Sequence, residues 1–265
     1  MAARIQVCGR LALEFDGARL EGRLPGRQGR LVVVYLATNR HRAVARAELV
    51  DALWPHMGPA DPEAALTVVI SKVRAALGHG AIEGRSDLRL ALPDAWVDLE
   101  AADEAIHRAE AAVSRGDWAA AWAPARVALG VAERGFLPDH DAEWVVERRL
   151  MLEEVRLRAL GCVGRAGLGL DGLELTAAGR AGRALVRLSP YRETGHRILM
   201  EALTKQGDIA EALRVYEELR VRLREKLGST PSRETQDLHR RLLRDEGEPA
   251  IGVTSPHDRV SERSR

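Results

Sequence analysis

The chain has 265 residues, a length typical of about two domains. Its 40 Lys and Arg residues are balanced by 39 Asp and Glu residues, so the net charge of +1 argues against binding of nucleic acid or membrane through bulk charge alone. Two cysteines are too few for a disulfide framework, and the sequence has no run of about 18 apolar residues that could span a membrane.

The first part of the chain, residues 1–97, contains short strand patterns and helices. Apolar and polar residues alternate between Arg4 and Phe15, and the following Asp16-Gly17 pair is typical of a hairpin turn. Three helices come next, and a second pair of short strands follows them; this order of elements is typical of a winged helix-turn-helix. The predicted elements are strands at 3–15 and 18–20, helices at 27–39, 46–54 and 61–77, and strands at 81–85 and 88–92.

The third of these helices, at 61–77, has one apolar face and one largely polar face. An α-helix fits the major groove of DNA, where short polar or cationic side chains can contact base edges. An ordinary solvated amphipathic helix has the same periodicity, so the pattern alone leaves both interpretations open. The residues predicted to contact bases are Thr67, Val68, Ser71 and Lys72.

Basic residues concentrate near the N-terminus despite the neutral total. Residues 1–46 contain nine arginines and three acidic residues, a local net charge of +6. Arginines that open a helix, where main-chain N–H groups also favour anions, are candidates for phosphate contacts, although each one could equally be ordinary solvated surface. The candidates of this kind are Arg27, Arg30 and Arg46.

Strand patterns disappear after Asp98, and residues 98–246 are predicted to form paired helices. Gly116-Asp117 and Gly207-Asp208 occupy equivalent corners between helices, in the manner of tetratricopeptide repeats. Arg192 and Glu193 are expected to form an ion pair at another corner. Trp118, Trp122 and Trp144 would line a concave groove or, on the more ordinary interpretation, pack in the core. The predicted helices are 102–115, 118–130, 142–166, 172–188, 191–206, 209–227 and 231–245, and the tail at 247–265 is predicted to be disordered.

Two blocks of sequence resemble a known family. Residues 46–54 (RAELVDALW) and 64–78 (AALTVVISKVRAALG) resemble the OmpR-type winged helix of SARP-family antibiotic regulatory proteins. Residues 188–203 (LSPYRETGHRILMEAL) and 227–231 (LGSTP) resemble the bacterial transcriptional activation domain of the same family. The resemblance implies a mainly α fold with a small β component: a DNA-binding winged helix-turn-helix, followed by a tetratricopeptide-like α-helical repeat domain.

The resemblance also implies a function. Members of the family activate transcription of secondary-metabolite, or antibiotic, gene clusters in the bacterial cytoplasm, where they associate with the nucleoid when bound. They bind direct repeats in double-stranded DNA as a pair of protomers, here expected to be a homodimer, and recruit RNA polymerase. By this resemblance Lys72 contacts a base, Arg74 contacts phosphate, and the loop carrying His56 and Met57 faces polymerase.

The resemblance places Arg85 and Arg89 on the wing, although Asp87-Leu88 stands where the family usually has Gly-Tyr. A competing interpretation is a helical-repeat scaffold, or co-regulator, with weak or no DNA binding. No catalytic constellation, metal site or cofactor site is predicted. The segment 167–172 matches G-x-G-x-x-G, but it follows a helix rather than a strand, so we interpret it as a turn between helices.

Overall fold

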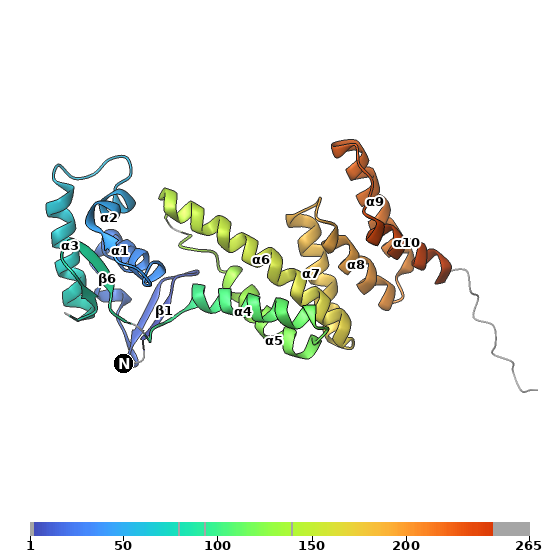
Figure 1. Cartoon of the computed structure of the whole chain (residues 1–265), viewed down its shortest axis with the longest axis horizontal. Coiled ribbons are helices and arrows are strands. Elements are labelled where there is room, and N and C mark those ends of the chain that lie inside the picture. The colour runs from blue at the N-terminus through green and yellow to red at the C-terminus, as the bar shows by residue number, and fades with distance from the viewer. Residues whose placement is uncertain (1–2, 79, 93, 139, 246–265) are drawn as a thin grey trace, which may run out of the picture.

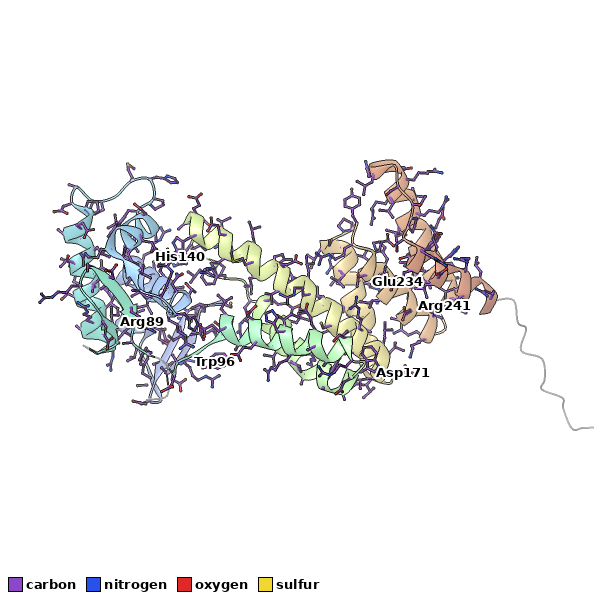
Figure 2. The ribbon with its side chains drawn as sticks, in the orientation of Figure 1. Arg89, Trp96, His140, Asp171, Glu234 and Arg241 are labelled. Carbon is purple, nitrogen blue, oxygen red and sulfur yellow. The ribbon has the colours of Figure 1, made fainter. Side chains whose placement is uncertain are left out.

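A computed structural model of the chain describes residues 3–78, 80–92, 94–138 and 140–245. The molecule is elongated, with a mixed α and β unit at one end and stacked helices along the rest of its length (Figure 1). Figure 2 labels two residues at the far end of this stack, Glu234 and Arg241. The tail predicted to be disordered lies outside the described residues.

The N-terminal unit has the predicted order of strands and helices, and the winged-helix prediction is confirmed. Three helices, α1 to α3, pack together, and a small sheet borders them (Figure 1). The elements are β1 Ala3–Gln6, β2 Ala12–Phe15, β3 Ala18–Arg19, a 3-10 turn Glu21–Arg23, α1 Gly26–Thr38, β4 Val44–Ala45, α2 Arg46–Leu53, α3 Pro62–Leu77, β5 Ile82–Glu83, β6 Asp87–Leu90 and β7 Trp96–Val97.

Two sheets lie in this unit. The first has the strand order β3-β2-β1-β7, in which β1 pairs antiparallel with β2 and parallel with β7. The second has the order β4-β6-β5, and its β5–β6 hairpin is the wing. Leu88, which stands where the family usually has Tyr, is fully buried and pairs with Val44 of β4. The sequence did not indicate β4 or β7, since two residues are too few to show an alternating pattern.

Helices account for the rest of the described chain, which confirms the predicted repeat of helix pairs. Within the described residues, no helix has the length and apolar composition needed to cross a bilayer. Neighbouring helices in the sequence pack against one another, from α4 through α9. The helices are α4 Asp98–Ser114, α5 Trp118–Ala132, α6 Glu143–Leu170, α7 Glu174–Leu188, α8 Glu193–Lys205, α9 Ile209–Leu227 and α10 Arg233–Asp245.

The two predicted Gly-Asp corners have the same geometry. Gly116 and Gly207 adopt left-handed backbone, with φ of +70° and +88°, which glycine reaches without steric cost. The N–H of the next residue then donates back into the preceding helix in both corners: Asp117 to Ala112 at 3.0 Å and Asp208 to Leu203 at 2.9 Å. This shared turn places α5 on α4 and α9 on α8 in the same way.

Helix α6 extends further than the sequence suggested, to Leu170, so the turn predicted at 167–172 is wrong over its first four residues. Gly167 and Gly169 are helical residues, and both allow close packing. A Cβ at Gly167 would lie 2.7 Å from the carbonyl oxygen of Glu174, and a Cβ at Gly169 would lie 2.4 Å from the ring of Trp118. These glycines therefore bring α7 and α5 close to α6, and the chain turns only at 171–173.

The winged helix and the helical stack meet at a buried carboxylate. Asp98, the first residue of α4, accepts hydrogen bonds from the backbone N–H groups of Val7 at 2.9 Å and Cys8 at 3.1 Å. Arg134 forms an ion pair with the same carboxylate at 3.1 Å. Burial raises the pKa of Asp98, while the two N–H groups and Arg134 oppose that rise. This anchor explains why α4 begins four residues earlier than predicted.

Trp144, near the start of α6, packs against the winged helix. Its ring meets those of Tyr35 and Phe136 edge-on, with centroids 5.0 and 5.9 Å apart, and its indole N–H donates to the Ala52 carbonyl at 3.0 Å. Buried residues of both units form one continuous apolar core around it. For Trp144 the core interpretation is therefore confirmed.

The N-terminus of α10 is capped by a side chain from another helix. Glu193, at the start of α8, accepts hydrogen bonds from the Ser232 N–H at 2.9 Å and from the hydroxyls of Ser232 and Thr235. Arg197 adds an ion pair at 3.8 Å. Burial by itself raises the pKa of Glu193, but these hydrogen bonds and the Arg197 charge hold it below its ordinary value.

The predicted ion pair between Arg192 and Glu193 is wrong. Adjacent residues at a helix start do not face one another, so their side chains reach different neighbours. Arg192 pairs with Glu154 of α6 at 3.2 Å, while Glu193 turns toward α10. The corner is thus held by contacts to two other helices rather than by a local pair.

Replacing Asp98 with alanine is expected to lower the free energy of unfolding by about 3 kcal/mol, because two backbone N–H groups and Arg134 lose their shared acceptor. Urea unfolding followed by circular dichroism measures the change. Asp94→Ala, at an exposed aspartate of the same segment, is the control. Equal effects of the two variants would contradict the anchoring role of Asp98.

Replacing Glu193 with glutamine is expected to destabilise the helical stack at pH 7 by about 2 kcal/mol. Because the folded pKa of Glu193 lies below its unfolded value, its contribution is present above the unfolded pKa and is lost as the pH falls through the folded pKa. Unfolding curves of both proteins between pH 7 and pH 3 should therefore converge at acid pH. A difference that stays constant with pH would exclude the carboxylate as its source.

Candidate nucleic-acid interface

Helix α3 forms for local reasons and presents one face to solvent. Asp61 caps it by accepting the Ala64 N–H at 2.9 Å, and Pro62 occupies the first helical position. Leu66, Ile70 and Val73 are buried against α1 and α2. The opposite face is therefore fixed toward solvent by the packing of the apolar one.

All four residues predicted to contact bases lie on that exposed face. Thr67, Ser71 and Lys72 are exposed, and Val68 is 52% exposed although it is apolar. Among the residues that the structure describes, Lys72 has no ion pair or hydrogen bond to the protein. Its ammonium group can therefore bind an external acceptor without breaking an internal contact.

Val68 and Lys72 also line an open groove of about 720 Å³. Met57, from the loop between α2 and α3, lines the same groove and is 91% exposed. Gln28, near the N-terminus of α1, also lines it, although no sequence pattern indicates a role for this residue. The structure thus joins the predicted base-contacting face to the loop predicted to face polymerase, while His56 is exposed on that loop.

Arg46, a predicted phosphate contact, is tied to α3 from the start of α2. Its guanidinium pairs with the Glu63 carboxylate at 2.8 Å and donates to the Thr67 hydroxyl at 2.7 Å. Thr67 in turn donates to the Glu63 carbonyl at 2.9 Å. The structure therefore brings Arg46 and Thr67 together, but Glu63 neutralises much of the positive charge that Arg46 would offer to phosphate.

Arg74, another predicted phosphate contact, holds the wing. Its guanidinium donates to the carbonyl of Ile82 at 3.1 Å and to that of Gly84 at 2.7 Å, so it links the C-terminal half of α3 to the β5–β6 turn. Gly84 has a φ of +93°, and a Cβ there would lie 1.8 Å from the Asp87 carbonyl oxygen. The turn therefore depends on a glycine and on an arginine from the neighbouring helix.

The two predicted wing arginines are not placed together. Arg85 follows Gly84 in the turn and is exposed. Arg89 lies further along β6 (Figure 2), where it donates to the Arg40 carbonyl at 3.2 Å and lines a surface hollow with Arg40 and His41. Only Arg85 occupies the tip of the hairpin, which is the part of a wing that can enter a minor groove.

Ion pairs reduce the positive charge counted from the sequence. Arg40 pairs with Glu100 at 2.6 Å, and Arg42 pairs with Glu48, so these arginines meet carboxylates from later in the chain. The hydrogen bond to Arg42 is the main cause that lowers the pKa of Glu48. A count over residues 1–46 misses these partners because most of them lie beyond position 46.

Arg27 and Arg30 are exposed near the N-terminus of α1. Within the described part of the chain, neither forms an ion pair or a side-chain hydrogen bond. Among the described residues of the winged helix, Arg27, Arg30, Lys72 and Arg85 thus carry positive charge that no ion pair balances, as do Arg10 and Arg23. Lys72 lies on the exposed face of α3, Arg85 lies in the β5–β6 turn, and Arg27 and Arg30 lie near the start of α1.

Comparison with known proteins gives the same architecture. A model of the family described as the bacterial transcriptional activator domain matches residues 97–243. The solved structure of Mycobacterium tuberculosis EmbR in complex with a low-affinity phosphopeptide superposes with a TM-score of 0.78 at 23% identity, covering 92% of this chain and 65% of that one. At this identity the likeness concerns the fold alone.

Two curated relatives are regulators. Regulatory protein AfsR of Streptomyces coelicolor is 31% identical over 257 residues, which is 96% of this chain and 25% of AfsR. Transcriptional regulatory protein EmbR of Mycobacterium bovis is 28% identical over 253 residues, which is 89% of this chain and 62% of EmbR. The chain therefore spans about a quarter of AfsR and less than two thirds of EmbR.

Arg74→Ala is expected to lower the free energy of unfolding by about 1–2 kcal/mol and to increase hydrogen exchange at the β5–β6 turn, because two carbonyls lose their donor. Lys72→Ala, two positions earlier on the same helix, should leave the free energy of unfolding within about 0.5 kcal/mol of the parent and should leave hydrogen exchange at the turn unchanged. Urea unfolding and exchange mass spectrometry give the two readouts. If Arg74→Ala matched Lys72→Ala, the wing would not depend on Arg74.

Proposed function

This chain belongs to the SARP family of bacterial transcriptional regulators that carry the bacterial transcriptional activator domain, and we propose that it binds specific DNA and activates transcription there. One observation carries the proposal: α3 of a winged helix presents Val68, Ser71 and Lys72 outward, and no described residue binds the Lys72 ammonium group. Residues 1–97 would hold the DNA, and residues 98–246 would form the partner-binding helical domain.

In this mechanism α3 enters the major groove. The Lys72 ammonium group would donate to a guanine O6 or N7, and Ser71 and Thr67 would contact neighbouring base edges. The exposed Val68 side chain would contact a thymine methyl group. Arg46 keeps the Thr67 hydroxyl in a fixed orientation at 2.7 Å, which favours a single arrangement of this face.

Phosphate contacts would set the register of α3 in the groove. Arg27 and Arg30 are exposed, and the amides at the start of α1 add partial positive charge. Arg46 and Arg74 would take part mainly by fixing α3 and the wing, since their donors already bind protein acceptors. Arg85 at the wing tip would enter the minor groove, and Arg89 would contact the backbone beside it.

The remaining parts of the proposal concern assembly at a promoter. Two protomers would bind direct repeats as a homodimer, and the loop carrying His56 and Met57 would contact RNA polymerase. The exposure of Met57 beside the DNA-facing groove supports a contact made while DNA is bound. The regulated genes would form a secondary-metabolite cluster, as the resemblance of this chain to AfsR suggests.

Footprinting on the DNA upstream of the gene and of its neighbours tests the proposal. Lys72→Ala should weaken specific protection by roughly tenfold or more, because a base contact is lost. Arg187→Ala, at an exposed arginine of α7, should leave the protection unchanged. If the parent protein protects no specific site, the scaffold interpretation replaces this one. If Lys72→Ala protects as well as the parent, α3 does not select the sequence.

The salt dependence of binding separates phosphate contacts from base contacts. Arg27→Ala and Arg30→Ala should each reduce the slope of log affinity against log salt by roughly one, and should weaken binding to all sequences alike. Fluorescence anisotropy with specific and scrambled duplexes at several salt concentrations measures both effects. An unchanged slope would remove the arginine concerned from the phosphate-binding surface.

A further inference from the structure

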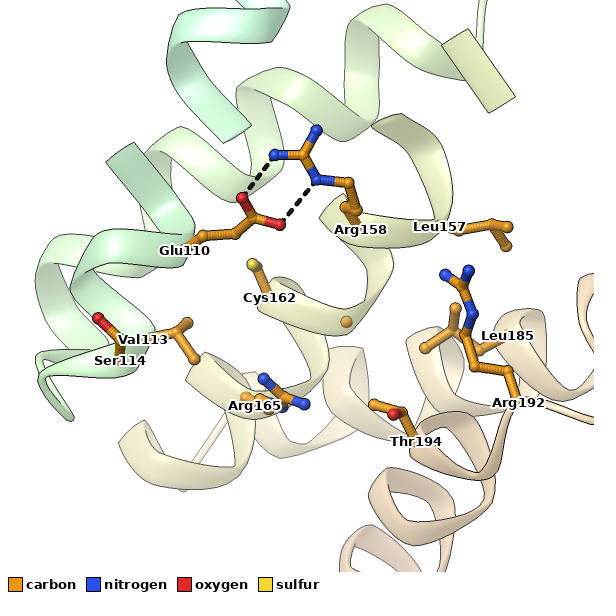
Figure 3. Close-up of a pocket in the computed structure, with 11 residues that line it drawn as sticks. Glu110, Val113, Ser114, Leu157, Arg158, Cys162, Arg165, Leu185, Arg192 and Thr194 are labelled. Atoms are coloured by element: carbon orange, nitrogen blue, oxygen red, sulfur yellow. Dashed lines mark hydrogen bonds and ion pairs between the residues drawn. The ribbon is translucent and has the colours of Figure 1, made fainter. Parts of the chain in front are cut away.

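The helical stack contains a cavity of about 240 Å³ where α4, α6, α7 and α8 meet (Figure 3). Its apolar wall is formed by Val113, Leu157 and Leu185. Gly161 lies within it, and a Cβ built on this glycine would meet nothing within 4 Å. The cavity therefore has open space beside an apolar wall, on the part of the molecule that the DNA-binding proposal does not use.

Positive charge lines this cavity in excess. Arg158 binds the Glu110 carboxylate through two parallel hydrogen bonds at 2.8 and 2.5 Å. Arg192 also lines the cavity and forms an ion pair with Glu154 at 3.2 Å. Arg165 is exposed in the cavity, and among the described residues it forms no ion pair or hydrogen bond. A guanidinium in this position is a ready partner for an anion.

Among the described residues that line the cavity, Glu110 is the only acidic one, and Arg158 holds its carboxylate; Glu154, which does not line the cavity, pairs with Arg192. Cys162 lies between that ion pair and Arg165 (Figure 3), and burial raises the pKa of its thiol to about 11. The thiol is therefore neutral at pH 7 and adds to the apolar wall. The Thr194 hydroxyl, on the opposite side, can donate one hydrogen bond.

We propose that this cavity binds a small carboxylate with an apolar body, with the carboxylate on Arg165 and Arg192 and the body against Val113, Leu157 and Leu185. A planar carboxylate matches the fork of a guanidinium. The volume is below the 300 Å³ or more that drug-sized ligands occupy, so the ligand is short. A free organic acid and the C-terminal residue of a peptide share this chemistry.

The position of the cavity gives such a ligand a route to the winged helix. Helix α6 supplies Leu157 and Arg165 to the cavity, and its other end carries Trp144 and Arg149 at the joint between the two units. A ligand that holds α6 against α8 therefore acts on the same rigid helix that packs on the winged helix. Binding itself does not depend on the proposed DNA function.

Calorimetry and thermal unfolding of the full chain without DNA test the proposal, with sodium octanoate as the probe. Octanoate is expected to bind and to raise the melting temperature, whereas octanol and octylamine are not. Arg165→Gln should lower the affinity for octanoate at least about tenfold. Gly161→Leu, which fills the cavity, should abolish binding. Arg187→Gln, an exposed arginine of α7 outside the cavity, is the matched control.

A second arm separates the two sources of carboxylate. The acetylated dipeptide Ala-Leu is compared with its C-terminal amide; preferential binding of the free acid supports a peptide terminus as the ligand, and binding of octanoate alone supports an organic acid. Equal binding of octanoate and octanol, equal effects of Arg165→Gln and Arg187→Gln, or no binding of either acid at millimolar concentration would overturn the proposal. Because no DNA is present, none of these outcomes bears on the DNA-binding function.

Discussion

The carboxylate of Asp98 holds two units together, beside a backbone hydrogen bond that the Gly9 N–H donates to the Gly135 carbonyl at 2.6 Å. This fully buried carboxylate accepts hydrogen bonds from two backbone N–H groups of the segment after β1, and it binds the partly exposed Arg134, which lies just after α5. Trp144 extends the same joint from α6. Since the core is continuous across this boundary, the orientation of the winged helix follows from the position of the helical stack.

Within the winged helix, most arginines have structural partners and only a few do not. Arg46 and Arg74 link α3 to α2 and to the wing through hydrogen bonds, and they thereby hold the exposed face of α3 in place. Arg27, Arg30 and Lys72 have no such partners among the described residues. A near-neutral protein can therefore present local positive charge, because its carboxylates pair with arginines such as Arg40, Arg42 and Arg46 and leave Arg27, Arg30 and Lys72 without a described ion pair.

The helical stack shows how small residues set the distances between helices. The glycines of α6 allow α5 and α7 to approach closely, whereas Gly161 faces open space and leaves a cavity. The same helix thus packs tightly over its last turns and contributes a cavity in its middle. Its length, from the joint at Trp144 to Leu170, places that cavity and the winged helix on one rigid element.

The sequence by itself determined the order of elements, the Asp61 cap of α3, the two Gly-Asp corners and the family, because each depends on local backbone chemistry or on a contiguous motif. Only the tertiary structure decided which arginines are occupied, since Glu48, Glu63 and Glu100 reach them from other elements. It also decided that α4 begins at Asp98, that Arg192 pairs with Glu154, and that β4 and β7 exist. These features depend on partners distant in the sequence, which no local pattern encodes.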